Sequence, residues 1–346
     1  MSKEQVIFLD KETFHPNGNS LIDNDTKVLN ILIVDIRGLT DFHIIGKKVE
    51  WSPLIWLMFE KERIGRLDTL RICLGMAKLT STSKNILQTL FPDVEIQYCE
   101  MLLSIGSTNN FKAAKQLAQR FRESPKDKHF FYSSGSLRIQ RFLLIYWLQQ
   151  HNISNISDVG HPEIDQQSLR SFKNWLTRFS NHDYSDYRNE DKRFFGDIRV
   201  DEFNNKIYPM RCRSMISIVT SYPYFDYAES NYDDKVAFTF ASKSLPFFLG
   251  NCNDNSNLPD LGFRTYAGFD YSADKIENFV QRWQSMFESN KNFLFDTKNN
   301  RDIYENNLEV IEFNFDLLLS TDWDKKLLRE LEKMPAMVRQ LISSYM

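Results

Sequence analysis

The stretch from Ile216 to Tyr266 constrains the fold most, because it alternates short apolar runs with a helix-like segment. It opens with an apolar run, 216–219, that suits a buried strand. An acidic, aromatic loop follows at 222–231, and residues 236–243 have the pattern of a helix. A second apolar run, 247–249, ends at Gly250. This order is typical of a parallel α/β sheet, whose ligands bind beyond the carboxyl ends of the strands.

The rest of that stretch predicts a short helix from Leu258, a turn at Gly262 and a further strand edge reaching Tyr266. A separate apolar run lies near the start of the chain. Residues 29–36, LNILIVDI, predict a central parallel strand with a loop at its carboxyl end, and 6–9 predict an edge strand. No Gly-x-Gly-x-x-Gly follows, so the run is no dinucleotide fingerprint. Two such signals in 346 residues indicate two α/β domains.

A polar boundary at Ser124 to Lys128 separates the two signals. We expect an N-terminal α/β domain at 1–124 and a second α/β domain at 125–300. The second domain is expected to carry a polar insertion at 160–206, and the chain is expected to end in helices at 301–346. The basic residues between Lys112 and Lys128 are interpreted as a solvated face in preference to a phosphate patch.

Residues 129–150 have the pattern strand, small-residue turn, helix, which is typical of an anion site. The turn contains Ser134 and Gly135, and Arg138 and Arg141 occupy the first turns of the helix. Unpaired backbone N–H groups point outward from a helix start. An ordinary strand-to-helix turn without a ligand stays an equal alternative. Residues 207–213 are expected to return to the sheet as a strand. Arg211 and Arg213 would then alternate faces, so at most one would point at the ligand.

Three motifs carry a resemblance to a known family: Tyr232-Asp233-Asp234-Lys235, Ser244-Leu245-Pro246-Phe247-Phe248-Leu249-Gly250 and Leu261-Gly262-Phe263-Arg264-Thr265-Tyr266. Together they resemble the donor-binding block of B-type glycosyltransferases. The nearest likeness is to a glycosyltransferase-like family common in tailed phages and large viruses, with a fainter similarity to α1,3-fucosyltransferases. The resemblance implies an α/β fold of two Rossmann-like domains facing a cleft, with the C-terminal helices at 301–346 packing back on the first domain. It also implies that the domain at 1–124 is the acceptor side and that the domain at 125–300 binds the nucleotide sugar. Asp233-Asp234 replaces the Thr-Glu pair of the family.

The resemblance also implies roles for individual residues. Asp234 would accept hydrogen bonds from the donor ribose, Lys235 would contact the diphosphate, and Tyr232, with Tyr222, would lie near the base or ribose. Arg138, Arg211 and Arg213 would support the departing diphosphate, which gains charge in the transition state. A general base, needed only by an inverting enzyme, would be Asp41 or His43, which follow the first strong strand. No cofactor is expected beyond the donor itself. Asp233 and Asp234 are adjacent and cannot easily face one ion, so no metal is expected either.

The composition limits which partners and which cellular compartment we expect. The net charge is −3, which gives no overall attraction to nucleic acid or to an anionic membrane. No apolar run is long enough to span a bilayer, and the first residues lack the pattern of a signal peptide. We therefore expect a cytoplasmic protein, in the host cytoplasm if the chain is viral. The cysteines (Cys73, Cys99, Cys212 and Cys252) are scattered and are expected to be reduced.

Two classes of function stay open. The chain is either a glycosyltransferase that uses a nucleotide sugar or a transferase-like fold without catalysis that serves as a binding or virion structural protein. Modified phage DNA and a surface glycan are both candidate acceptors, although the net charge does not support nucleic acid. The sugar, the stereochemical outcome and any virion or homo-oligomer assembly are not specified by the sequence.

Overall fold

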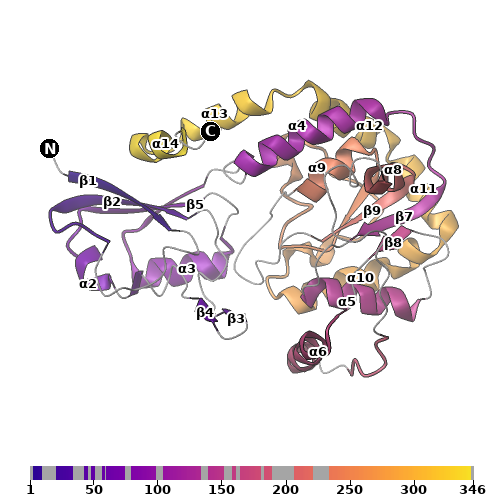
Figure 1. The fold of residues 1–346 in the computed structure, drawn as a ribbon, viewed down its shortest axis with the longest axis horizontal. Coiled ribbons are helices and arrows are strands. Elements are labelled where there is room, and N and C mark those ends of the chain that lie inside the picture. Colours follow the sequence, from indigo (N-terminus) through magenta and orange to yellow (C-terminus); the bar gives the residue numbers. More distant parts are fainter. Residues whose placement is uncertain are drawn as a thin grey trace. The chain divides into compact units, whose positions relative to one another are not determined.

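The computed structural model describes residues 3–9, 21–33, 43–45, 48–50, 57–58, 60–74, 79–98, 104–133, 139–151, 158–160, 164–180, 183–188, 206–220 and 234–343. The chain forms two compact units (Figure 1). Unit 1 consists of 1–109, 224–231 and 322–346, and unit 2 of 110–223 and 232–321. Each unit contains a parallel four-stranded sheet with helices, so the predicted α/β class is confirmed. The predicted domain boundaries, as limits of independent folding, stay a prediction.

The sheet of unit 1 is built in chain order, β1-β2-β5-β6, with all three neighbouring pairs parallel. Its strands are β1 (Lys3–Leu9), β2 (Thr26–Ile33), β5 (Thr69–Leu74) and β6 (Glu95–Tyr98). The predictions of a central strand at 29–36 and an edge strand at 6–9 are confirmed by β2 and β1. Residues 29–33 of β2 are all buried, because a central parallel strand is covered on both faces.

Short elements complete unit 1. β3 (His43–Ile45) and β4 (Lys48–Glu50) form an antiparallel pair. The helices are α2 (Lys61–Ile64), α3 (Ser81–Leu90), α13 (Trp323–Leu331) and α14 (Ala336–Ser343). α14 packs against β1, and residues 322–346 belong to unit 1, whereas residues 301–321 of the expected returning segment belong to unit 2.

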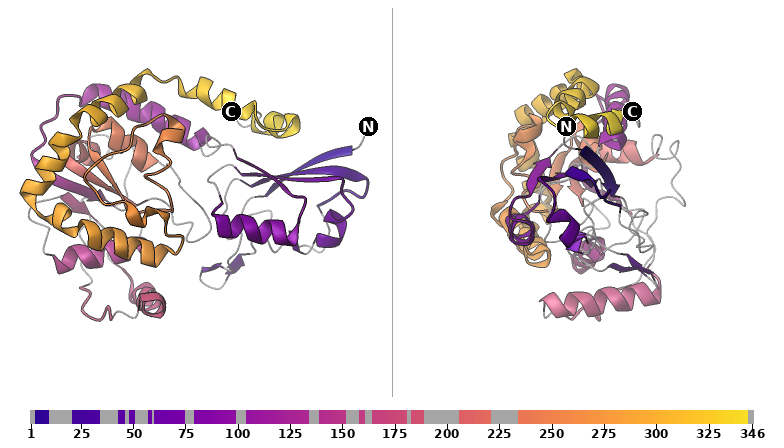
Figure 2. Two further views of the ribbon diagram at one scale, coloured as in Figure 1. Left: turned by 180° about the vertical axis from the view of Figure 1, so that it is seen from behind. Right: turned by 90° about the vertical axis from the view of Figure 1, so that its left-hand side faces the viewer.

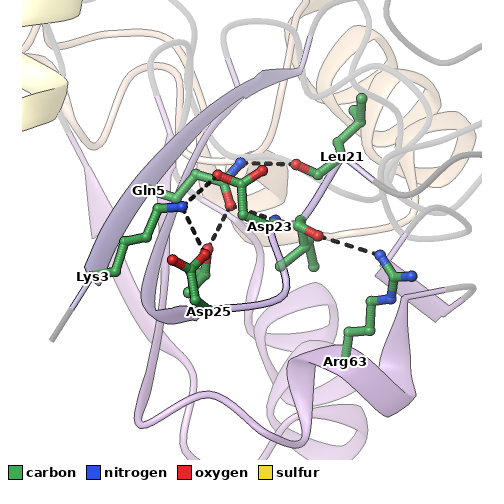
Figure 3. Close-up of polar contacts among 8 residues, drawn as sticks. Lys3, Gln5, Leu21, Asp23, Asp25 and Arg63 are labelled. Atoms are coloured by element: carbon green, nitrogen blue, oxygen red, sulfur yellow. Dashed lines mark hydrogen bonds and ion pairs between the residues drawn. The ribbon is translucent and has the colours of Figure 1, made fainter.

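Polar side chains tie the amino end of β1 to the turn that leads into β2 (Figure 3). The Gln5 amide nitrogen donates to the carbonyl of Leu21 at 2.8 Å. The Gln5 carbonyl oxygen accepts from the backbone N–H of Asp23 at 3.0 Å and from the Thr26 hydroxyl at 2.8 Å. The Lys3 ammonium pairs with Asp23 at 3.0 Å. A single glutamine thus satisfies three backbone or hydroxyl groups of the turn, which fixes where β2 begins beside β1.

The sheet of unit 2 has the order β10-β9-β7-β8, again with every pair parallel. Its strands are β7 (Lys128–Ser133), β8 (Asp158–Gly160), β9 (Ser214–Val219) and β10 (Leu245–Phe248). All six residues of β9 are buried. Pro246 lies in β10, which is an edge strand and tolerates a residue without an N–H. The predicted strands at 216–219 and 247–249 are therefore confirmed, the second with a shifted start.

Helices cover both faces of this sheet. α8 (Tyr208–Cys212) and α9 (Asp234–Ala241) lie on one face, and α5 (Ile139–Gln150) and α10 (Phe279–Phe295) lie on the other (Figure 1 and Figure 2). The remaining helical elements that involve unit 2 are α4 (Ser104–Arg120), α6 (Gln166–Ser180), α11 (Thr297–Asn306), α12 (Leu308–Ser320) and the 3₁₀ turns η3 (Leu258–Leu261) and η4 (Ser272–Lys275).

Two sequence predictions in this unit are wrong. Residues 207–213 form helix α8 in place of a strand, because Pro209 is preorganised for a helix start and Tyr208 and Cys212 place their buried side chains one turn apart. Residues 263–266 do not form a strand. Asparagine side chains form hydrogen bonds with backbone groups of this segment instead.

Three buried asparagines hold the segment from 264 to 270 at intervals of three residues. Each accepts from the backbone N–H of one residue and donates to the carbonyl of the same residue, with distances between 2.7 and 2.9 Å: Asn314 with Arg264, Asn307 with Ala267, and Asn290 with Asp270. The asparagines come from α12, the junction of α11 and α12, and α10. These amides therefore replace the hydrogen bonds that a neighbouring strand would provide.

Candidate functional site

The strand order of unit 2 reverses between β7 and β9. From β7 the chain continues through α5 to β8 on one side, and from β9 it continues through α9 to β10 on the other. β7 and β9 are direct neighbours, with Phe131 opposite Ser217. Loops that leave a sheet in opposite directions open a crevice at the carboxyl ends of the two strands, where α/β proteins bind ligands. The candidate site of this chain is that edge, at the ends of β7 (Ser133) and β9 (Val219).

Both segments that the sequence singled out leave the sheet at this edge. The small-residue turn follows β7, and the acidic, aromatic loop follows β9. Their connections end at the amino ends of α5 and α9. The helix dipole makes such ends favourable for anions. The topology thus brings the ends of β7 and β9, the strands that precede these two segments in the sequence, to the same edge of one sheet.

Several predicted residues lie outside the described part of the chain. These are Asp41, Ser134, Gly135, Arg138, Tyr222, Tyr232 and Asp233. Two others are described by their backbone alone. His43 is the first residue of β3 and pairs with Glu50, and Asp234 is the first residue of α9.

Lys235 is the second residue of α9, and its side chain is partly buried. Its backbone carbonyl accepts from the Arg211 guanidinium at 3.0 Å and from the Thr239 hydroxyl at 2.7 Å. A cation in the first turn is disfavoured by the helix dipole unless an anion lies near. Lys235 lies in the first turn of the helix that follows β9, and its contact with a diphosphate stays a prediction.

Arg211 reaches this turn from α8 and is buried, with 6% of its surface exposed. Its Nη1 donates to the Lys235 carbonyl at 3.0 Å and lies 3.4 Å from the Thr239 hydroxyl oxygen. The guanidinium carbon is 5.0 Å from the centre of the Phe131 ring, within the range of a cation–π contact. These contacts direct the guanidinium at protein groups of α9 and β7.

Arg213 is placed differently. Its guanidinium forms a two-point ion pair with Asp127, one arm of which is 2.9 Å, and this pair lowers the pKa of Asp127. Its carbonyl accepts from the N–H of Lys128 at 3.0 Å. Arg213 directly precedes β9, so it lies at the amino ends of the strands, opposite the edge that the predicted loops leave. We therefore do not assign Arg213 to the donor site.

Arg141 is the third residue of α5 and is buried, with 7% of its surface exposed. It thus lies near the start of the helix that follows the small-residue turn. A buried guanidinium at a helix start is costly unless it is compensated by hydrogen bonds or an anion. This placement marks Arg141, with Lys235, as a cationic residue at the carboxyl edge within the described part of the chain.

The sequence reasoning missed a lysine enclosed at the opposite edge. The Lys126 ammonium donates to the carbonyls of Ser214 and Ser242 at 3.0 and 2.7 Å and to the Ser244 hydroxyl at 3.3 Å. Burial of the ammonium group lowers the pKa of Lys126 to about 7. The residue as a whole is partly buried. Lys126 was expected on a solvated basic face, and no sequence signal distinguishes it from its basic neighbours.

A second feature that the sequence reasoning missed is the set of hydrogen bonds that side chains of α10 donate to the loop after β10. The Gly250 carbonyl accepts from the Trp283 indole N–H at 2.7 Å and from two nitrogens of Arg282 at 3.3 Å each. The Asp274 carboxylate accepts from the N–H and hydroxyl of Ser256 at 3.1 and 2.9 Å. Leu249 donates to the Val219 carbonyl at 2.9 Å. These hydrogen bonds therefore hold the loop next to the end of β9.

Within the described residues, no cluster of three or more His, Cys, Asp or Glu side chains is arranged to hold a metal ion. Cys73, Cys212 and Cys252 are buried and are reduced thiols. None of the helices in the described ranges combines the length and apolar character that a membrane crossing requires.

No protein-family model matches the sequence. No curated protein matches it either. Among solved structures, the chain is similar to one described as "Crystal structure of GtfA/B complex", with 12% sequence identity and a TM-score of 0.35. The likeness covers 92% of this chain and 57% of that one, so our chain spans a little over half its length. A TM-score this low supports no argument, and the proposal that follows rests on the residues of the chain itself.

Proposed function

We propose that the chain transfers a sugar from a nucleotide-sugar donor and binds that donor at the carboxyl edge of the unit 2 sheet. The observation that supports this proposal is the adjacency of β7 and β9, because the two predicted donor segments follow these two strands in the sequence and the strand order reverses between them. Motifs that resemble a donor-binding block would be expected to converge in this way. Residues that only cap a helix would not need to follow neighbouring strands of one sheet.

The proposed chemistry uses the residues of that edge. An acceptor oxygen attacks the anomeric carbon, the bond from that carbon to the diphosphate oxygen breaks, and the nucleoside diphosphate leaves with the electron pair. In this proposal Lys235, Arg138 and Arg141 stabilise the charge that the diphosphate gains. The amino ends of α5 and α9 add to this field. Asp234 accepts from the ribose hydroxyls, and Tyr232 lies against the base or ribose. Ser134 and Gly135 offer backbone N–H groups to a phosphate.

The acceptor side is assigned to unit 1 by the resemblance. An inverting reaction needs a base that removes the acceptor proton, and Asp41 or His43 is proposed for that role. A phage or viral role, with modified DNA or a surface glycan as acceptor, belongs to the same proposal.

The alternative is a transferase-like fold that binds without catalysing. One observation favours it, which is that Asp233-Asp234 stands where the resembling family has Thr-Glu. An aspartate is shorter than a glutamate by one methylene, so its reach to a ribose changes. A binding or virion structural role would then retain the fold without turnover.

Nucleotide binding tests the proposal. Titration calorimetry and thermal unfolding would be run with uridine and guanosine diphosphates on the native chain and on Lys235→Ala. A ligand that binds only the folded state raises its stability. Loss of a charge-assisted contact of roughly 1.5–3 kcal/mol should weaken binding about ten- to hundredfold.

Lys298→Ala is a matched control, because Lys298 is also the second residue of a helix, α11, and is exposed. It should bind like the native chain. Absence of binding to all three proteins would overturn the proposal. Binding of nucleotide without sugar transfer or donor hydrolysis would favour the alternative.

A further inference from the structure

We propose that Arg211 is a positioning residue of the donor site, which acts by fixing the first turn of α9 and with it Lys235. This inference rests on the proposed function for its ligand, a nucleoside diphosphate. It differs from the expectation that Arg211 itself contacts the diphosphate. The juxtaposition that carries it joins Arg211 of α8, the carbonyl of Lys235 in α9 and the ring of Phe131 in β7.

The contacts of Arg211 converge on the start of α9. Nη1 donates to the Lys235 carbonyl at 3.0 Å, and the Thr239 hydroxyl donates to the same carbonyl at 2.7 Å. Thr239 lies one turn further along α9. The Lys235 carbonyl is therefore held by two side-chain donors in addition to its place in the helix. A carbonyl oxygen has two lone pairs, so these donors share them, and together they restrain the first turn of α9.

The other side of the guanidinium faces the central sheet. Phe131 lies in β7, the strand that leads to the small-residue turn, and its ring centre is 5.0 Å from the guanidinium carbon. Arg211 thus contacts elements on both sides of the strand-order reversal. One planar group that stacks on a ring while its edge donates to a carbonyl is a geometry that arginine provides and lysine does not. This arrangement sets the distance between the start of α9 and β7.

Because the Arg211 guanidinium is buried, its contacts with α9 and β7 matter for stability. Only 6% of Arg211 is exposed, and a buried cation is destabilising unless carbonyl, hydroxyl or aromatic groups compensate it. Arg211→Met should release the Lys235 carbonyl and loosen the first turn of α9, while Arg211→Lys keeps one donor and loses the planar stacking. We therefore expect nucleoside diphosphate affinity to fall about tenfold in Arg211→Met and by less in Arg211→Lys.

A double-mutant cycle separates positioning from direct contact. Uridine and guanosine diphosphate affinities would be measured for the native chain, Arg211→Met, Lys235→Ala and the double variant. If Arg211 acts through Lys235, its substitution costs little once the Lys235 side chain is absent, because coupled residues are not additive. Independent effects that add would overturn the positioning role and indicate direct contact.

Leu318→Ala controls for lost stability, since Leu318 is a fully buried core residue of α12 and not part of the proposed site. It should lower the unfolding temperature while leaving nucleotide affinity unchanged. Equal loss of affinity in Leu318→Ala and Arg211→Met would show that Arg211 acts through global stability alone.

Hydrogen exchange tests the same inference without a nucleotide. Amides of residues 236–241 should exchange faster in Arg211→Met than in the native chain, while amides of β2 in unit 1 keep their rates. Unchanged exchange at the start of α9 would overturn the inference whether or not the chain binds nucleotides. If exchange is faster in Arg211→Met, as expected, but the native chain binds no nucleotide, the result would contradict the proposed function and leave the positioning of α9 by Arg211 in place.

Discussion

Asn314 holds both backbone polar groups of Arg264: its amide oxygen accepts from the Arg264 N–H at 2.8 Å, and its amide nitrogen donates to the Arg264 carbonyl at 2.9 Å. Asn307 and Asn290 repeat this contact at Ala267 and Asp270. The residue directly before each of these points, Phe263, Tyr266 and Phe269 in turn, is buried. The motif Leu261 to Tyr266, which carried part of the family resemblance, is therefore explained here by packing.

We predict that Asn314→Ala destabilises the chain by about 2–4 kcal/mol, because the buried amide is lost and two part-buried backbone groups and the Tyr266 hydroxyl lose a partner. Urea unfolding followed by circular dichroism measures this change. Asn306→Ala is the matched control, since Asn306 is exposed at the end of α11. If the two variants unfold at the same urea concentration, the asparagine contacts do not stabilise the segment.

We predict that Gly268→Ala is destabilising by about 1–3 kcal/mol, because this glycine has a φ of +97° and an added Cβ would lie 3.2 Å from Cγ1 of Ile303. Thermal unfolding gives the comparison. Gly65→Ala serves as the control, since Gly65 ends α2 with a φ of −64° that alanine adopts freely. Equal unfolding temperatures for the two variants would contradict the account of the turn.

Much of the fold could be predicted from the sequence because parallel strands are continuous apolar runs. β2, β9 and β10 were found this way, and their order placed the candidate loops at a carboxyl edge. The asparagine contacts could not be predicted, because a buried asparagine and a turn asparagine look alike in a sequence. Their partners also lie 20 to 50 residues away. Helix α8 was missed because five residues are too few to show helical periodicity.

The candidate site was predicted only in part for a related reason. A lysine at the start of α9 follows from the local pattern, whereas the direction of a long cationic side chain does not. Arg211 was expected to contact a phosphate and contacts the Lys235 carbonyl. Lys126 was expected in solvent and is enclosed by three acceptors. In both cases the partners come from elements that only the tertiary fold brings together.

Asp274 provides a prediction for acidic pH. Burial raises its pKa in the folded chain, against the opposing effect of the bonds from Ser256. A carboxyl whose folded pKa is raised contributes stability that is complete below the unfolded value of 3.8 and is lost as the pH rises through the folded value. Asp274→Asn keeps an acceptor for Ser256 without this titration. Its unfolding free energy should therefore improve relative to the native chain between pH 3 and 7, and a constant difference would contradict this.

At alkaline pH, Lys126 should make the stability of the chain rise with pH, which is the opposite of the effect of Asp274. Its pKa falls from 10.5 in the unfolded chain to about 7 in the folded chain, because the ammonium group is buried. As the pH falls below 10.5, the unfolded chain takes up this proton first, so the stability contributed by the neutral amine is lost toward pH 7. We predict that the unfolding free energy of the native chain rises from pH 7 to 10 relative to that of Lys126→Met, by up to about 1.4 kcal/mol per pH unit. Lys298→Met, altered at an exposed position, should reproduce the native pH dependence. Parallel curves for the native chain and Lys126→Met would show that Lys126 stays charged, with its three acceptors matching the three protons of the ammonium group.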